Sequence, residues 1–511
     1  MKKIVLLFSL FCLSAPLSAQ EVMYEIFTRS FFDSNNDGYG DLKGVEQKLD
    51  ELYKLGVTSI VLSPIYQSSF YHNYYADSFE KIDTTYGNWA DYKALIKAVH
   101  LRRMKIYQDV QLNYVSGKHV WYKDSYRNPN SQYSGYISYT DKQNKKPIFL
   151  KNIELHSTYN DNKEQVVAVN LTSPDVQKYF LKQLSDLIYI NEDAMGKDGV
   201  DGFRFIGMGN GYPSQGATGQ GLKTFWKPLI EGLKKVNPKL EVIALQSGKD
   251  KYGSDCFTVA NADRVYANPL REAITTFDKK KIIAAADSTF TTLPKDKQPI
   301  VFLEIPETDR FSSLEGITID KLRVAAALNL LIGGVPSIYY GQEIGMHGRQ
   351  FEVEVDGQII PVRQSYKWYA DTITKGAALW YLNNAPWKDK DPMIPNDGFS
   401  LEEQQKTPNS LFDFYKELIK LRRRQPAIGL GNYSRVANTN DNVIAFTKIG
   451  GNQKVLVMIN LSGSQQVVSI ADDSLPLNKL QLIMGSANYN FPKGGRTLIL
   501  PPYWVQVWRM M

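Results

Sequence analysis

The chain has 511 residues, of which 43% are hydrophobic and 22% are charged, so it can bury a large core and is too long for one ordinary compact domain. Its 60 basic and 53 acidic residues give a formal net charge of +7 without a concentrated run of either sign. That balance predicts a solvated surface and argues against a nucleic-acid-binding protein. We expect two or three domains.

The first 19 residues have the pattern of a secretory signal peptide. Lys2 and Lys3 precede an apolar run at 4–13, and small residues follow up to Ala19. An uncleaved anchor is the alternative, but the run is shorter than the roughly 20 residues that span a bilayer. We expect cleavage after Ala19, export to the periplasm or medium, no membrane span, and a soluble mature chain. Cys12 leaves with the peptide, so Cys256 has no disulfide partner and is expected to be a small core residue.

Short β-rich runs alternate with helical stretches along most of the chain. Eight such units are what a (β/α)₈ barrel of the α/β class requires. The runs lie at 22–28, 57–62, 105–113, 200–206, 240–246, 264–268, 300–305 and 337–341. We therefore assign the barrel to 20–113 and 168–425. The polar stretch at 114–167 is too long for a simple loop and predicts an inserted subdomain after the third strand.

The pattern changes after a helical signal at 410–424. Six short strand signals separated by turn residues follow it, at 443–448, 454–461, 465–470, 480–484, 497–500 and 503–509. They predict a C-terminal antiparallel β-sandwich over 430–511.

Four segments in order resemble glycoside hydrolase family 13, the family of α-amylases and α-glucosidases. They are FDSNNDGYGDL at 32–42, DVQLN at 109–113, DGFR at 201–204 and IYYGQEIGM at 338–346. Together with the barrel pattern, the insertion and the terminal sandwich, the resemblance spans almost the whole mature chain. It implies an exported protein of α-glucan metabolism, although fold alone does not establish function.

The resemblance also implies that the catalytic positions are degenerate. The nucleophile position is Ile206, and the general acid falls at Leu245, or at Gln246 if the alignment shifts by one residue. A retaining glycosidase needs two carboxyl groups at these places. On the seventh strand only one acid remains, Glu307, after Ile305 and Pro306. No catalytic residue is intact.

Both histidines that contact sugar in the family are replaced as well. Tyr114 follows Asn113 where the family has one of them, and Pro306 stands where the seventh-strand pattern Asn-His-Asp has the other. The lysine and histidine that often follow the fourth strand correspond to Gly209 and Asn210. With the nucleophile, the acid and both histidines absent together, we expect ordinary glycosidase activity to be lost.

Four residues are candidates for substrate binding: Tyr74, Asp109, Arg204 and Glu307. Tyr74 keeps the place of the family tyrosine that stacks beneath the sugar, although tyrosines here could equally pack the insertion against the barrel. Asp109, like Asp201, is more simply read as a barrel brace. Arg204 lacks the acid it normally accompanies and needs another partner, such as Glu307 or a bound anion.

The loop at 33–41 alternates oxygen donors in the manner of a calcium site. Asp33, Asn35, Asp37, the Tyr39 carbonyl and Asp41 could wrap one hard cation, and in family relatives this loop binds calcium. The alternative is a polar turn held by side-chain hydrogen bonds. We expect a structural Ca²⁺. The five histidines show no zinc-ligand spacing.

Three functional hypotheses remain open. The first is a non-catalytic family member that binds an α-glucan or another oligosaccharide, or assists a neighbouring enzyme or importer. The second is an active hydrolase or transglycosylase with a site rearranged around Glu307 and Gln246. The third is a protein-interaction platform that does not bind sugar, which predicts a filled pocket and an exposed apolar patch.

Overall fold

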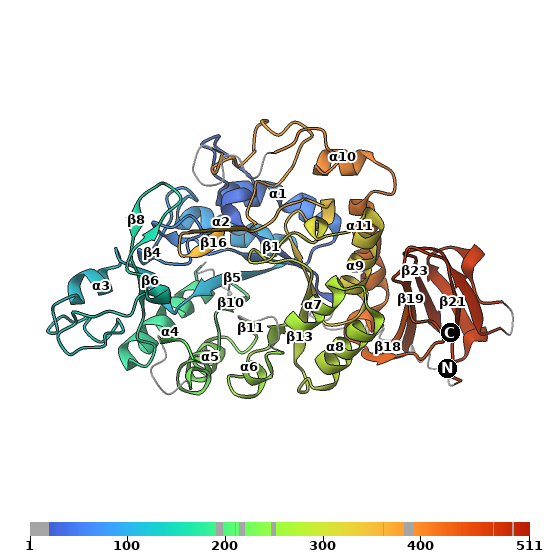
Figure 1. The fold of residues 1–511 in the computed structure, drawn as a ribbon. Helices are drawn as coiled ribbons and strands as arrows, with labels where there is room; N and C mark the ends of the chain where they lie inside the picture. The colour runs from blue at the N-terminus through green and yellow to red at the C-terminus, as the bar shows by residue number, and fades with distance from the viewer. Residues whose placement is uncertain are drawn as a thin grey trace, which may run out of the picture.

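A computed structural model describes residues 20–190, 198–209, 211–213, 220–246, 252–360, 362–382, 393–473, 475–492 and 495–510. The expected signal peptide at 1–19 and Asn210 lie outside the described residues. Figure 1 shows the barrel in the middle of the molecule, with the segment around α3 at one end and the C-terminal sheets at the other.

Within the described residues, eight parallel strands close into a barrel, which confirms the predicted fold. The strands are β1 (Met23–Ile26), β2 (Ser59–Leu62), β5 (Lys105–Gln111), β10 (Gly202–Ile206), β11 (Glu241–Leu245), β12 (Arg264–Tyr266), β13 (Gln298–Phe302) and β14 (Val335–Tyr339). Each lies in or overlaps one predicted run. The last two begin two residues earlier than predicted, because Pro299 and Pro336 look like strand breakers in sequence but are accommodated inside these strands.

Helices follow the strands and cover the outside of the barrel (Figure 1). Asp41 caps α1, and Asn88 forms a capping box with Asp91 at the start of α2, so local sequence fixes where these helices begin. The helices around the barrel are α1 (Leu42–Leu55), α2 (Trp89–Leu101), α4 (Pro174–Ile188), α5 (Lys227–Val236), α6 (Ser254–Thr258), α7 (Asn268–Thr275), α8 (Lys279–Thr291), α9 (Ile319–Leu331), α10 (Leu401–Lys406), α11 (Leu411–Arg424) and α12 (Pro426–Leu430).

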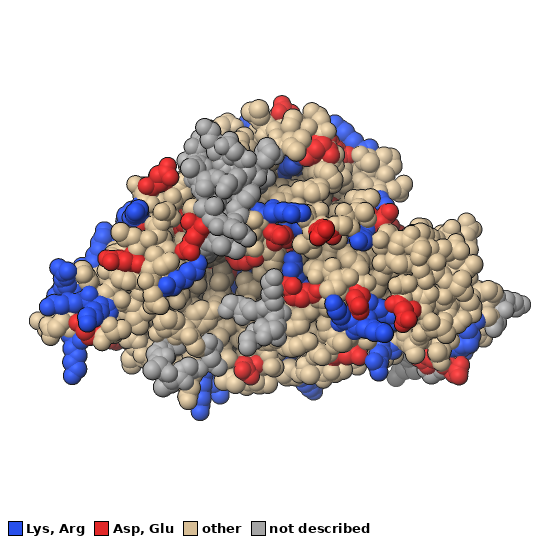
Figure 2. Space-filling model, in the orientation of Figure 1, with Lys and Arg blue, Asp and Glu red and all other residues tan. Residues whose placement is uncertain are grey.

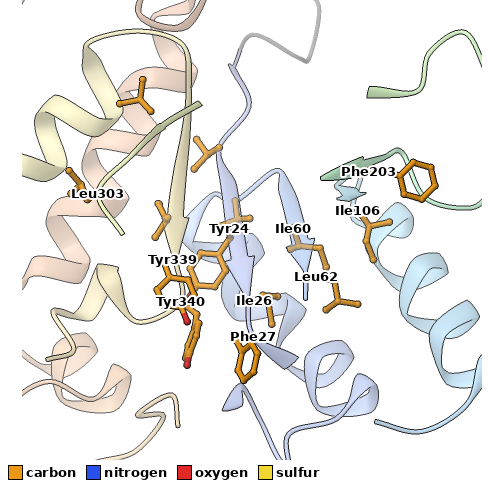
Figure 3. Packing of buried hydrophobic residues seen from close by; sticks show 14 of the residues in the cluster. Tyr24, Ile26, Phe27, Ile60, Leu62, Ile106, Phe203, Leu303, Tyr339 and Tyr340 are labelled. Carbon is orange, nitrogen blue, oxygen red and sulfur yellow. The ribbon is translucent and has the colours of Figure 1, made fainter. Parts of the chain in front are cut away.

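Alternation along the strands divides the core into two parts. Tyr24 and Ile26 of β1 belong to the large cluster that packs strands against helices, with Ile60 and Leu62 of the next strand (Figure 3). Met23 belongs instead to a smaller cluster inside the barrel. Because successive side chains point to opposite faces, one apolar strand serves both clusters.

The segment predicted as an insertion forms small elements of its own. The strands β6 (Tyr114–Ser116) and β9 (Val166–Ala168) pair antiparallel at its base, and between them lie α3 (Val120–Ser125), β7 (His156–Ser157) and β8 (Lys163–Glu164). Two hairpins lie outside it: β3 (Tyr66–Gln67) with β4 (Ser78–Ile82), and β15 (Phe351–Val355) with β16 (Gln358–Ile360).

The C-terminal part is antiparallel, as predicted. One sheet has the order β17-β18-β19-β23-β21, and β20 pairs with β22 in a second. The strands are β17 (Asn432–Arg435), β18 (Val443–Gly450), β19 (Gln453–Asn460), β20 (Gln466–Ser469), β21 (Leu480–Met484), β22 (Thr497–Leu500) and β23 (Val505–Met510). Buried residues of both sheets, among them Leu456, Val468 and Trp508, form one core. The prediction missed β17, whose residues are all at least partly exposed and carry no apolar alternation.

The surface carries charges of both signs. On the face drawn in Figure 2, basic and acidic side chains are interspersed among uncharged residues. In the part of the chain that the structure describes, no helix is both long enough and apolar enough to cross a membrane.

Candidate functional site

A cavity of about 330 Å³ opens at the carboxyl ends of the barrel strands. This is the end where barrel enzymes place their active sites. Its wall is made by Tyr74, Tyr75, Gln111, Ile206, Gly207, Tyr212, Leu245, Gln246, Asn268, Arg271, Glu272, Phe302, Ile305, Glu307 and Thr308. The sequence-predicted positions Tyr74, Ile206, Leu245 and Glu307 are therefore brought together in one place.

The floor of this cavity is apolar. Ile206 and Leu245 are the last residues of β10 and β11 and are direct partners in the register of these strands. They pack with Phe302 and Ile305 in the cluster inside the barrel. Gln246 lines the same cavity, so neither alignment of the fifth strand supplies a carboxylic acid. These side chains can neither attack a sugar nor transfer a proton to it.

A buried ion network lies inside the barrel around Arg204. Its guanidinium holds Asp109 through two hydrogen bonds, of 2.9 Å and 2.6 Å, and reaches Glu25 at 2.6 Å and the Tyr266 hydroxyl at 2.9 Å. Arg204, Asp109 and Glu25 are each at most 2% exposed. Burial raises the pKa of Asp109 to about 6 against the opposing charge of Arg204. The network ties four barrel strands together, β1, β5, β10 and β12.

This network gives Arg204 partners other than the two that the sequence suggested. Arg204 takes its carboxylate partners from β5 and β1 rather than from Glu307 or a bound anion. Neither Asp109 nor Arg204 lines the cavity. The physical reason is that Glu25 points into the barrel and supplies the second acid that the guanidinium needs. Asp201 is also a brace, since it accepts the backbone N–H of Ile106 at 2.8 Å.

Arg363 lies against Tyr74 and Glu307, two residues of the cavity wall. It donates to the Tyr71 hydroxyl at 2.7 Å and to Glu307 at 3.1 Å. Its guanidinium carbon lies 5.2 Å from the centroid of the Tyr74 ring, and Tyr74 is only 4% exposed. The residue predicted to stack beneath a sugar therefore lines the cavity but is largely covered by a cation.

Sequence reasoning missed several residues of the site. Arg363 follows the last barrel strand in a long connection, and nothing in its local sequence marks it. Arg271 and Glu272 are adjacent residues of α7, and their side chains form an ion pair of 2.7 Å at the cavity wall. The sequence did contain a sign that Glu25 is a buried ionic residue, because it is the one charged residue within the four-residue strand β1.

Comparison with known proteins decides the family. The model of the α-amylase catalytic domain matches residues 25–208 and 243–431. The chain belongs to the α-amylase family. "Alpha-amylase 3" of Dictyoglomus thermophilum is 26% identical over 88% of this chain and 86% of its own length, and the oligo-1,6-glucosidase of Bacillus cereus is 24% identical over 96% and 99%. The crystal structure of an α-amylase from H. orenii superposes with a TM-score of 0.78 at 24% identity, covering 96% of this chain and 99% of that one.

Tyr114 and Gly209 are two further positions of this α-amylase-family chain that the sequence singled out. Tyr114 packs in a buried cluster with Tyr74 and Tyr75, so it fills space where a polar ring was expected. Gly209 is described but does not line the cavity. Cys256 is buried as predicted and lies 2.8 Å from the Gln246 amide, and burial raises the pKa of its thiol to about 12. That thiol is inert.

The loop predicted to bind calcium is a tightly hydrogen-bonded turn. Asp33 accepts the backbone N–H groups of Asn36 and Gly38 at 2.7 and 2.8 Å. Asp41 accepts from Gly44 at 2.6 Å as the cap of α1. These contacts are those of the polar turn, one of the two alternatives considered from sequence. Among the residues that the structure describes, no group of three or more His, Cys, Asp or Glu is arranged to hold a metal. A donor set would therefore have to include the Asn35 amide and the Tyr39 carbonyl.

Proposed function

We propose that this chain is a non-catalytic member of the α-amylase family that binds an α-glucan or a related oligosaccharide at the mouth of its barrel. The observation that carries the proposal is the pair Ile206 and Leu245, which stand side by side on the cavity floor. Without a nucleophile there is no covalent intermediate, and general acid catalysis alone contributes on the order of 10² to 10⁴ in rate.

The cavity keeps features that suit a sugar. It is open rather than filled, which disfavours the hypothesis of a protein platform without a pocket. Gln111, Gln246 and Asn268 place side-chain amides at its wall, where they can exchange hydrogen bonds with hydroxyl groups. The apolar floor can receive the C–H face of a ring, and Tyr75 adds an aromatic side chain.

We further propose that the protein is exported, periplasmic or secreted, and that it delivers or retains glucan for a neighbouring enzyme or importer. The sequence of residues 1–19 supports export. Mass spectrometry of the protein recovered from the culture or periplasm tests it. A mature N-terminus at Gln20 supports the proposal, and an intact Met1 or a cytoplasmic location contradicts it.

Calorimetric titration of residues 20–511 with maltoheptaose tests the main proposal. We expect saturable heat without shortened products. Sustained heat with shorter oligosaccharides would establish turnover and overturn it, and a flat trace would exclude this class of glucan.

A matched pair of variants localises the binding. Ile206→Trp projects a larger side chain into the open cavity and should abolish the heat, because Ile206 is half-buried at its wall. Leu101→Trp makes a comparable substitution at a residue that is 75% exposed on α2 and should bind as the parent does. Equal binding by both variants would place the glucan elsewhere.

One observation favours a second candidate, an active enzyme with a rearranged site. Glu272 and Glu307 both line the cavity, and each is held by an arginine. If these acids form a working pair, product release from maltoheptaose should fall at least 100-fold in Glu307→Gln and in Glu272→Gln. The absence of any release from the parent protein would remove this candidate.

We also propose that the turn at 33–41 binds a structural Ca²⁺. The donors would be Asp33, Asn35, Asp37, the Tyr39 carbonyl and Asp41. The four side chains among them accept hydrogen bonds within the turn and at the start of α1. A bound ion would raise the midpoint of thermal unfolding by mass action. We expect 1 mM CaCl₂ to raise it relative to EGTA, and Asp33→Asn to remove the difference. Equal midpoints with CaCl₂ and with EGTA would contradict the site.

A further inference from the structure

A second and larger crevice lies at the opposite end of the barrel. Its volume is about 750 Å³, and it is lined where β11, β12 and β13 begin, by the loop after α8, and by residues 429–433 and Lys448 of the C-terminal part. The helix α8 contacts β17 and β18 there, and Figure 1 draws α8 beside β18. The crevice is therefore walled by two structural units, the barrel and the sheet.

Positive charge predominates in its lining. Six cationic residues face it: Lys234, Lys239, Arg264, Lys295, Lys297 and Lys448. The acidic residues are Glu241, Asp263 and Asp296.

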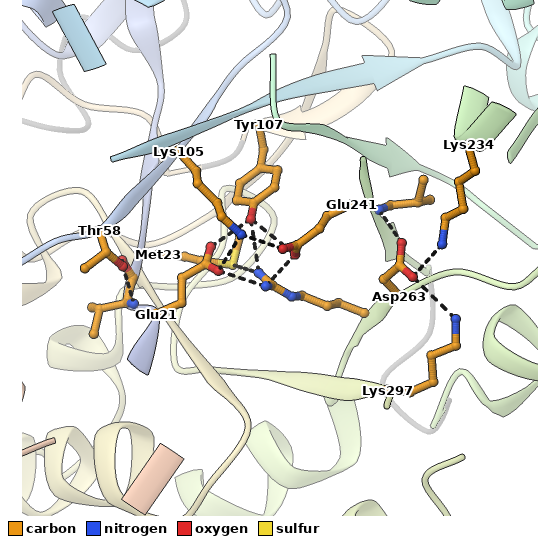
Figure 4. A network of polar contacts seen from close by, with 12 residues as sticks. Glu21, Met23, Thr58, Lys105, Tyr107, Lys234, Glu241, Asp263 and Lys297 are labelled. Carbon is orange, nitrogen blue, oxygen red and sulfur yellow. Dashed lines mark hydrogen bonds and ion pairs between the residues drawn. The ribbon is translucent and has the colours of Figure 1, made fainter. Parts of the chain in front are cut away.

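Two of these acids are already shared between cations (Figure 4). Asp263 holds Lys234 at 2.6 Å and Lys297 at 3.4 Å. Glu241 holds Lys105 at 2.5 Å and also pairs with Arg264. The carboxylates of the lining therefore do not neutralise all of its positive charge.

Lys448 is the unusual residue of this crevice. It lies on β18 and is only 2% exposed, and among the described residues no hydrogen bond or ion pair reaches its ammonium group. The ammonium nitrogen lies 5.3 Å from the centroid of the Phe290 ring. A Cβ on Gly333 would stand 2.5 Å from it, so a glycine makes the room that it occupies. A buried charge without a partner costs folding free energy.

Its surroundings add to this cost. Arg422 is fully buried and donates to the carbonyls of Leu330 and Gly334, with no carboxylate against it among the described ion pairs. Burial, together with the charge of Arg422, lowers the pKa of Lys448 to about 7. The buried hydroxyl of Tyr433, which also faces the crevice, has no hydrogen-bond partner in the described part of the chain.

We propose that this crevice binds a small phosphorylated sugar, with its phosphate against the Lys448 ammonium and the Tyr433 hydroxyl. A phosphate dianion supplies the charge and the acceptors that both groups lack, and lysine binds phosphate as a point charge. The crevice is too large for a phosphate alone. Gln298 and Asn432 also line the crevice, and their side-chain amides can exchange hydrogen bonds with the hydroxyl groups of the rest of the ligand.

Thermal unfolding and calorimetry of residues 20–511 at pH 6.5 test the proposal, with glucose 6-phosphate and inorganic phosphate as probes and chloride at matched ionic strength as the reference. We expect a saturable rise in the unfolding midpoint, with glucose 6-phosphate binding at least tenfold more tightly than phosphate. Equal affinities would limit the site to inorganic phosphate and overturn the sugar assignment. No saturable effect of either probe would overturn the whole proposal.

Three variants separate this site from non-specific charge effects. Lys448→Met should abolish binding and, in chloride, should be more stable than the parent, because it removes a buried charge. Tyr433→Phe should fold normally and bind at least tenfold more weakly. Lys280→Met removes an exposed lysine of α8 that is outside the lining and should bind as the parent does. Unchanged binding of glucose 6-phosphate to Lys448→Met would contradict the proposal. Lys448→Met should still give the same maltoheptaose titration as the parent protein.

Discussion

Replacing Arg204 by methionine tests whether the ion network inside the barrel is structural. Methionine has a similar length and no charge, so the change leaves Asp109 and Glu25, which are at most 2% exposed, without their cation. Removing one partner of a buried ion pair costs about 3 to 5 kcal/mol. Here the same guanidinium serves two carboxylates and the Tyr266 hydroxyl, so we expect the upper part of that range at pH 8.

The loss should depend on pH with a definite sign. Asp109 has a folded-state pKa of about 6, above its ordinary value of 3.8, so its stabilising protonation is complete at low pH and is lost as the pH rises through 6. Without Arg204 the pKa of Asp109 rises further. The penalty of Arg204→Met should therefore be smaller at pH 5 than at pH 8.

Guanidinium unfolding followed by tryptophan fluorescence at both pH values measures this. The triple variant Arg204→Met, Asp109→Asn, Glu25→Gln is the control and should recover much of the loss, since it leaves no unpaired charge. Maltoheptaose binding should be retained wherever Arg204→Met is folded, because Arg204 does not line the cavity. A penalty below about 0.5 kcal/mol at pH 8, or a larger penalty at pH 5, would refute the reasoning.

Further predictions concern the residues at the expected catalytic positions and two structural sites. Ile206→Asp, Leu245→Glu and Pro306→His combined should restore little release of reducing ends from maltoheptaose, because the surrounding residues have also changed; appreciable turnover would mean that the supporting groups survive. Partial burial disfavours protonation of His100, but two aspartates at 2.9 and 3.0 Å outweigh the effect of burial and raise the pKa of His100. The stability of the protein should therefore fall as the pH rises through that pKa. His100→Asn should flatten a series of unfolding midpoints measured from pH 5 to 9. A parallel series for the parent and the variant would contradict this assignment. Trp508→Ala should cost about 3 to 5 kcal/mol in the C-terminal core, where the side chain is fully buried; a change below 1 kcal/mol in its unfolding transition would contradict that packing.

The sequence by itself determined the barrel and the residue types at the ends of its fourth and fifth strands. Apolar runs such as 300–305 identify strands because a strand of a closed parallel barrel is buried on both faces. That Ile206 and Leu245 carry no carboxylate is likewise a property of the sequence alone. Caps such as Asp41 are equally local, since one side chain satisfies the first N–H groups of its own helix.

Only the tertiary structure decided which charges meet. Glu25 and Arg204 are 179 residues apart, and Arg363 reaches Glu307 across 56 residues. Alternation in a strand indicates which side chains point inward, but not which inward charge will find which partner, because that depends on strand order and register. For the same reason, the crevice around Lys448 could not be predicted from the sequence. A lysine within a strand looks like a solvated residue in sequence, and its burial follows from the packing of β18 against the barrel.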